Sequence, residues 1–72
     1  MPKLYSSDEI QKVLISLGFN YVSQKGSHGK FRNKSGSIVI LPMNKKEIPF
    51  GTFRSILRQA NIDKTIFNKI LK

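Results

Sequence analysis

Apolar residues near the start of the chain recur at the spacing of a helix. They lie three or four positions apart and so share one helical face: Ile10, Val13, Leu14 and Leu17. Ser6 can cap the first turn, and Glu9 three residues later can complete a capping box. Gly18 stands where a left-handed residue commonly ends a helix. The pattern predicts a helix over residues 7–17.

The next segment has the composition of a short strand and a turn. Residues 19–24 mix β-forming and polar side chains, which predicts a half-buried strand. Lys25-Gly26-Ser27 is a turn signal, because glycine adopts backbone conformations that other residues avoid. We expect the first strand and the first turn of an antiparallel sheet here.

The alternating pattern from residue 28 to residue 32 predicts a second strand. Successive side chains of a strand point to opposite faces, so His28, Lys30 and Arg32 share one face. Phe31 points to the other face. If Phe31 faces the helices, the three basic or titratable side chains face solvent together.

A hairpin turn and a third strand follow. Residues 33–36 predict the turn, in which Gly36 is free to take a positive φ. The apolar run at 37–41, stopped by Pro42, predicts the best-buried strand of the three.

The last third of the chain predicts two helices after a polar, basic loop at 43–48. Pro49-Phe50-Gly51-Thr52 leads into the first helix, whose apolar face consists of Phe53, Ile56, Leu57 and Ala60. Asn61 can end this helix, and Asp63 can cap a short final one. The apolar side of that final helix consists of Ile66, Phe67, Ile70 and Leu71.

The predicted fold class is α+β, with the element order α-β-β-β-α and a short helical tail. A three-stranded antiparallel sheet covered by helices on one face is the simplest way to bury these apolar stripes. A chain of 72 residues predicts a single domain over 1–72. Its core is thin, since a domain this small buries only about 60% of its unfolded surface. An active site would therefore lie on an open face.

The charge balance indicates the kind of partner. Thirteen Lys and Arg oppose four acids, for a formal net charge of +9. Such an excess attracts polyanions, because cations that meet phosphates release condensed counterions. Solubility alone is the simpler explanation, and a membrane surface would require the charge on one amphipathic helix. Much of the charge lies between the helices, so nucleic acid is the better partner, and an acidic protein is compatible with it.

The absence of cysteine narrows the chemistry. It excludes disulfides, thiolate zinc sites and cysteine nucleophiles, and it fits a cytoplasmic protein. No apolar run approaches the roughly 20 residues of a membrane span, so no membrane association is expected. Acids and histidine show no metal-ligand spacing, and no nucleotide-binding glycine motif is present. We expect no metal, no cofactor and no small-molecule partner.

His28, the sole histidine, is the candidate catalytic residue. It follows Gly26-Ser27 and is surrounded in sequence by Lys25, Lys30 and Arg32. Metal-free RNA cleavage needs a base for the 2′-hydroxyl proton, charge stabilisation at phosphorus and a donor for the leaving oxygen. Histidine suits the base, and the cations suit the phosphate. The donor could be Lys30, water or His28 in turn, and Ser27 is more readily a turn residue than a nucleophile.

The start of the second helix is a second candidate for phosphate binding. Backbone N–H groups at Gly51 and Thr52 could bind an anion, as helix N-termini do. Arg54 and Arg58 would add charge one turn apart. An ordinary helix with solvated arginines explains the same residues equally well.

Two blocks of the sequence resemble a known family. Residues 24–28 followed by Lys30-Phe31, and residues 48–60, are similar to the HicA toxin family, whose fold is like the double-stranded-RNA-binding domain. The resemblance runs from the end of the first helix through Ile62. It implies an endoribonuclease (an mRNA interferase) with His28 as catalytic residue, held inactive by a cognate HicB-type antitoxin. The chain departs from the family at Gly29, where many members have a second histidine.

Three functions therefore remain open. The first is a metal-independent endoribonuclease toxin that cleaves mRNA. The second is a non-catalytic RNA-binding module of the same shape. In the third, the basic face mainly docks an acidic antitoxin.

Overall fold

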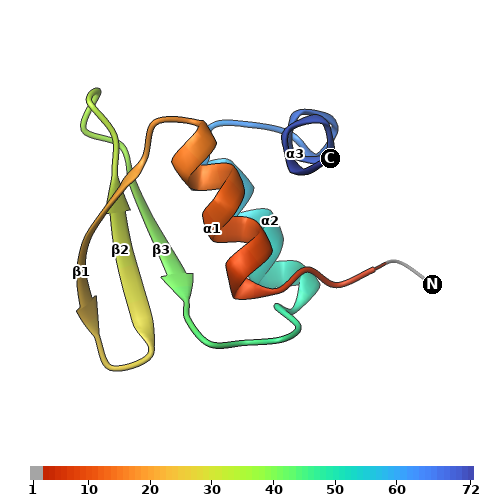
Figure 1. Ribbon diagram of the computed structural model, residues 1–72, viewed down its shortest axis with the longest axis horizontal. Helices are drawn as coiled ribbons and strands as arrows, with labels where there is room; N and C mark the ends of the chain where they lie inside the picture. Colours follow the sequence, from red (N-terminus) through yellow and green to blue (C-terminus); the bar gives the residue numbers. More distant parts are fainter. Residues whose placement is uncertain (1–2) are drawn as a thin grey trace.

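The computed structural model describes residues 3–72 and has the predicted α+β architecture (Figure 1). Its elements in chain order are α1 (Ser7–Ser16), β1 (Asn20–Lys25), β2 (His28–Arg32), β3 (Ile38–Pro42), α2 (Phe50–Ala60) and α3 (Lys64–Leu71). The strands form one antiparallel sheet in the order β1-β2-β3. Both α1 and α2 pack on β3, and the helices lie to one side of the sheet. The opposite face of the sheet is open.

The first helix begins and ends as its sequence predicts. The Glu9 amide donates to Ser6 Oγ at 3.1 Å, and the Ser6 amide donates to Glu9 Oε1 at 2.9 Å. This is the predicted capping box. Gly18 follows the helix with a φ of +95°, the conformation in which glycine commonly ends a helix.

A buried serine joins this helix to the loop after the sheet. The Ser7 hydroxyl donates to the Pro42 carbonyl at 2.6 Å and accepts from the Lys45 amide at 3.0 Å. The Ser7 amide donates to the Lys45 carbonyl at 2.9 Å. Ser7 is 1% exposed, so these partners offset the cost of removing its hydroxyl from water.

The core lies between the inner face of the sheet and the helices. Phe31, Val39 and Leu41 supply the sheet side and are fully buried. Phe53 lies against two other rings, with centroids 5.0 Å from Tyr5 and 4.9 Å from Phe67. Burying an aromatic or aliphatic side chain of this size stabilises a fold by about 1.5–3 kcal/mol. The apolar faces predicted for the first two helices are the buried ones, with Leu17 partly buried at the end of the first.

The end of α2 and the start of α3 also lie at the residues that the sequence predicts. Asn61 ends α2 in the left-handed conformation, with a φ of 60°. Asp63 Oδ1 accepts from the Ile66 amide at 2.9 Å and so caps α3. Of the apolar residues predicted for one side of α3, Phe67 is buried, whereas Ile66 is exposed and faces away from the core.

One prediction about the strands needs correction. The pattern over residues 19–24 predicts a half-buried strand. Phe19 is buried, but every residue of β1 is exposed, because β1 is the edge strand away from α2. The third strand is the best-buried of the three, as predicted; within it Val39 and Leu41 are buried, and Ile38 and Ile40 lie on the open face. The free edge of β3 is covered at one point, where Gln59 Oε1 accepts from the Ile40 amide at 2.8 Å.

No helix within residues 3–72 is long and apolar enough to cross a membrane.

Candidate functional site

A two-residue hairpin turn presents His28. Lys25 pairs with His28 across the β1–β2 ladder, which leaves Gly26 and Ser27 as the turn. Gly26 has a φ of +59°, and a positive φ at the first central residue alone is the pattern of a type II′ turn. The predicted turn is confirmed, and glycine is required at its first position.

Side-chain hydrogen bonds hold this turn from the β1 side. Gln24 Nε2 donates to the Gly26 carbonyl at 3.0 Å. The Tyr21 hydroxyl in turn donates to Gln24 Oε1 at 3.3 Å. Tyr21 is itself placed by an edge-on contact with the buried Phe31 ring, at a centroid distance of 5.7 Å. The turn is thus connected to the core through three side chains.

A backbone hydrogen bond holds the turn from the β3 side. The Met43 amide donates to the Ser27 carbonyl at 2.7 Å. His28 follows directly and pairs with Pro42. Because both carbonyls of the turn have partners, the backbone at His28 is fixed on two sides.

His28, Lys30 and Arg32 are all exposed, while Gly29 and Phe31 between them are buried. The predicted register of the second strand is therefore confirmed. A β-bulge between Tyr21 and Ser23 brings Ser23 opposite Lys30 on the neighbouring strand.

A depression of about 620 Å³ opens beside His28 on the open face of the sheet. It is lined by Ser23, Lys25, His28, Lys30 and Ile40. Ser23 and Ile40 are lining residues that the sequence pattern did not single out. The depression combines one imidazole, two ammonium groups, a hydroxyl and an apolar wall.

Among the residues that the structure describes, the cations of this face have no carboxylate partner. Within residues 3–72 a single ion pair forms, between Lys3 Nζ and Glu9 Oε2 at 3.1 Å, and it joins the first turn of α1 to the segment before it. Arg32 lies further along the same strand face, opposite Ile38. Lys25, Lys30 and Arg32 are thus free of carboxylate partners in the described part of the chain and can bind an anion from outside.

The His28 imidazole is exposed and accepts or donates no hydrogen bond within residues 3–72. No carboxylate lines the depression, so no acid–histidine relay is formed there. A base placed this way can accept a proton from a bound substrate, with its orientation set by the strand and by the substrate.

The residue after His28 points into the protein. A Cβ built on Gly29 would lie 2.9 Å from Met43 Sδ and 3.4 Å from the Phe31 ring. A side chain at this position would enter the core side of the sheet. It would lie on the opposite face of the sheet from His28.

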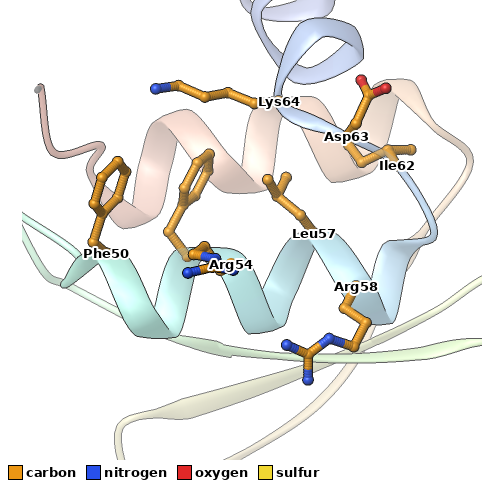
Figure 2. A pocket seen from close by; sticks show the side chains of 8 residues that line it. Phe50, Arg54, Leu57, Arg58, Ile62, Asp63 and Lys64 are labelled. Atoms are coloured by element: carbon orange, nitrogen blue, oxygen red, sulfur yellow. The ribbon is translucent and has the colours of Figure 1, made fainter.

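The predicted residues of α2 lie elsewhere. Gly51 and Thr52 are in the first turn of α2, which starts after Pro49 without a side-chain cap. Arg54 and Arg58 line a different groove, between α2 and the start of α3, as Figure 2 shows. The structure does not bring any of these four residues into the depression at His28. Their contact with RNA stays a prediction.

Fold and site together define a small basic α+β protein whose open sheet face gathers cations around one histidine. Residues 7–62 match the family described as HicA toxin of bacterial toxin-antitoxin. The match spans most of the chain, and the chain belongs to the HicA toxin family. The resemblance noted in the sequence is thereby confirmed, and the protein is a toxin of a toxin–antitoxin system. No curated relative matches the chain.

Proposed function

We propose that this protein is a metal-independent endoribonuclease that cleaves mRNA, with His28 as its general base. The observation that carries the proposal is the exposure of His28 beside Lys25 and Lys30 in one depression on an open, cationic sheet face. Membership of the HicA toxin family supports a toxic activity. Since its substrate would be mRNA, we place the action of the protein in the cytoplasm.

The reaction follows from the groups in the depression. His28 takes the proton of an RNA 2′-hydroxyl, and the 2′-oxygen attacks the adjacent phosphorus. The P–O5′ bond breaks, which leaves a 2′,3′-cyclic phosphate on one product and a 5′-hydroxyl on the other. The departing 5′-oxygen takes a proton from Lys30, from water, or from His28 after its protonation. General base catalysis of this kind contributes about 10²- to 10⁴-fold.

The surrounding cations have a separate role. Lys25 and Lys30 flank His28 and would stabilise the extra negative charge that develops on the phosphorane. Arg32 would bind the RNA backbone further along β2, and the turn at Gly26 and Ser27 would let that backbone approach closely. RNA binding should therefore weaken as the salt concentration rises.

We further propose that a HicB-type antitoxin neutralises the protein by covering His28. The imidazole is exposed and projects from the sheet face, so a protein partner can occlude it. Diethyl pyrocarbonate modifies accessible imidazoles, and the antitoxin should protect His28 from it in proportion to inhibition. Full inhibition with His28 still reactive would contradict occlusion.

The position of the attacking oxygen gives the test of the reaction. After the cleaved bond has been mapped in a short RNA, the same RNA is synthesised with one 2′-deoxynucleotide on its 5′ side. We expect binding to persist and cleavage at that bond to stop. Continued cleavage there would mean that water attacks and would refute the mechanism. Binding without cleavage of any RNA, with or without ribosomes, would favour the non-catalytic RNA-binding module.

A further inference from the structure

The groove between α2 and α3 is a second binding surface, separate from the depression at His28. It has a volume of about 420 Å³ and shares no lining residue with that depression. Its apolar lining consists of Phe50, Phe53, Leu57 and Ile62. Figure 2 shows Arg54 and Arg58 on the α2 side of this lining and Lys64 on the α3 side.

Phe50 is the exposed apolar residue of the groove. Its side chain is 40% exposed, whereas Phe53 and Leu57 beneath are buried. The Phe50 ring lies parallel to the Phe53 ring, at 10° and 6.5 Å between centroids. Lys64 Nζ lies 5.4 Å from the centroid of the Phe50 ring. Because these contacts fix the ring in place, a partner that covers it loses little conformational entropy.

The rim of the groove is positive. Its lining includes three cations, Arg54, Arg58 and Lys64, and one acid, Asp63. The Asp63 carboxylate is already engaged, since it accepts from the Ile66 amide as the cap of α3. The rim therefore presents cations to a partner, and the floor presents apolar carbon.

These two properties together select the occupant. RNA would pair with the arginines but would leave the partly buried Ile62 without a suitable apolar contact. A second copy of this chain, with a net charge of +9, would bring positive charge to a positive rim. A segment with carboxylates on one side and large apolar side chains on the other satisfies both rim and floor.

We infer that the α2–α3 groove binds an acidic, amphipathic helical segment of the antitoxin, anchored by apolar side chains against Phe50 and Ile62. The inference rests on the family membership, which supplies a protein partner, and does not depend on catalysis at His28. A segment held here leaves the sheet face free. It raises the effective concentration of the rest of the antitoxin near His28 and so speeds occlusion.

The probe for this site is a synthetic acetylated and amidated helical peptide of about 15 residues. It carries leucines one turn apart on one face and glutamates on the others. Amide chemical shifts of the ¹⁵N-labelled toxin should change along α2 and from residue 62 to residue 64. They should stay unchanged along β2. Changes confined to the sheet face would overturn the inference.

Matched charge reversals test the rim. Arg54→Glu with Arg58→Glu should weaken peptide binding at least about tenfold in fluorescence anisotropy. Lys34→Glu with Lys45→Glu alters the net charge equally, lies outside the groove, and should leave the affinity within about twofold. Equal losses in both double variants would reduce the binding to general charge attraction and contradict a specific site.

The apolar floor of the groove is tested with a variant of the toxin and a variant of the peptide. Phe50→Ala, checked for folding by amide dispersion, should weaken binding, and a peptide with serines for leucines should not bind. Equal binding of the serine peptide would refute the amphipathic occupant. If single-stranded RNA shifts the same amides and displaces the leucine peptide, the groove belongs to RNA and the inference fails. None of these readouts measures RNA cleavage, so they stand apart from the test of His28.

Discussion

The Met43 amide donates to the Ser27 carbonyl at 2.7 Å. Ser27 directly precedes His28, and Met43 directly follows Pro42, the residue that pairs with His28 across the sheet. This bond joins the end of β3 to the turn that presents the imidazole. Met43 is also the residue that a side chain at position 29 would meet. Gly29 therefore leaves room for the side chain of Met43, whose amide holds the turn that precedes His28.

The first prediction concerns Gly29. A Cβ there would lie 2.9 Å from Met43 Sδ, so Gly29→Ala requires the Met43 side chain to move. We expect a loss of about 1 kcal/mol in the free energy of unfolding, as for other overpacked sites. Urea denaturation measures it.

Gly51→Ala is the matched control for Gly29. Nothing lies within 4 Å of a Cβ at Gly51, and the residue is helical, so alanine should be neutral or stabilise by up to about 1 kcal/mol. Combining Gly29→Ala with Met43→Ala should remove the cost of the alanine at 29. Additive losses in that double variant would show that Met43 is not the obstacle.

The second prediction concerns Gln24 as a positioning residue. Gln24→Ala removes the hydrogen bond to the Gly26 carbonyl, and Gln24 is exposed, so the cost in stability should be small. If the turn orients His28, kcat should fall about tenfold or more with little change in KM. Gln11→Ala on α1 is the control and should leave both constants as they are. A change in KM alone would make Gln24 a binding residue instead.

The third prediction concerns pH and the capping box. The Ser6 amide donates to the Glu9 carboxylate and, with Lys3, lowers the pKa of Glu9 below its ordinary value of 4.5. The folded state therefore favours the ionised form. This stabilisation is complete above that value and is lost as the pH falls through the lower pKa of the folded protein.

Glu9→Gln isolates this contribution. Glutamine can still accept from the Ser6 amide but does not titrate. In urea unfolding at a series of pH values, the wild type should lose more stability than Glu9→Gln when the pH is lowered below about 4.5. Parallel pH curves for the two proteins would refute the assignment.

Local signals in the sequence predicted the helix ends. Ser6, Gly18, Asn61 and Asp63 each act within one turn of their own position, so composition and spacing suffice. The register of β2 was predictable for a similar reason. Alternation of polar and apolar residues leaves a single way to bury Phe31.

Tertiary contacts were not predictable in this way. Three features join segments far apart in the chain or break a regular pattern: the bulge beside Val22, the hydrogen bond that the Ile40 amide donates to Gln59, and the burial of Ser7. The apolar run 38–41 likewise gave no sign that Ile38 and Ile40 would face solvent, because a continuous run does not distinguish the two faces of a sheet.

In the candidate site, too, local patterns were predictable from the sequence and tertiary contacts were not. Lys30 and Arg32 could be grouped with His28 from strand periodicity, and Lys25 from its place in the turn just before His28. The structure places all four on one face. Arg54 and Arg58 are neighbours in sequence terms, one helical turn apart, but their groove depends on where α3 packs. No local pattern carries that information.

The central claim is that His28 catalyses metal-free cleavage of RNA. The direct measurement is cleavage of a long mRNA in excess EDTA by the wild type, by His28→Ala and by a mock purification. We predict cleavage by the wild type alone, with His28→Ala reduced about a hundredfold or more while its amide spectrum and RNA affinity are retained. Equal cleavage by the wild type and His28→Ala would contradict the account.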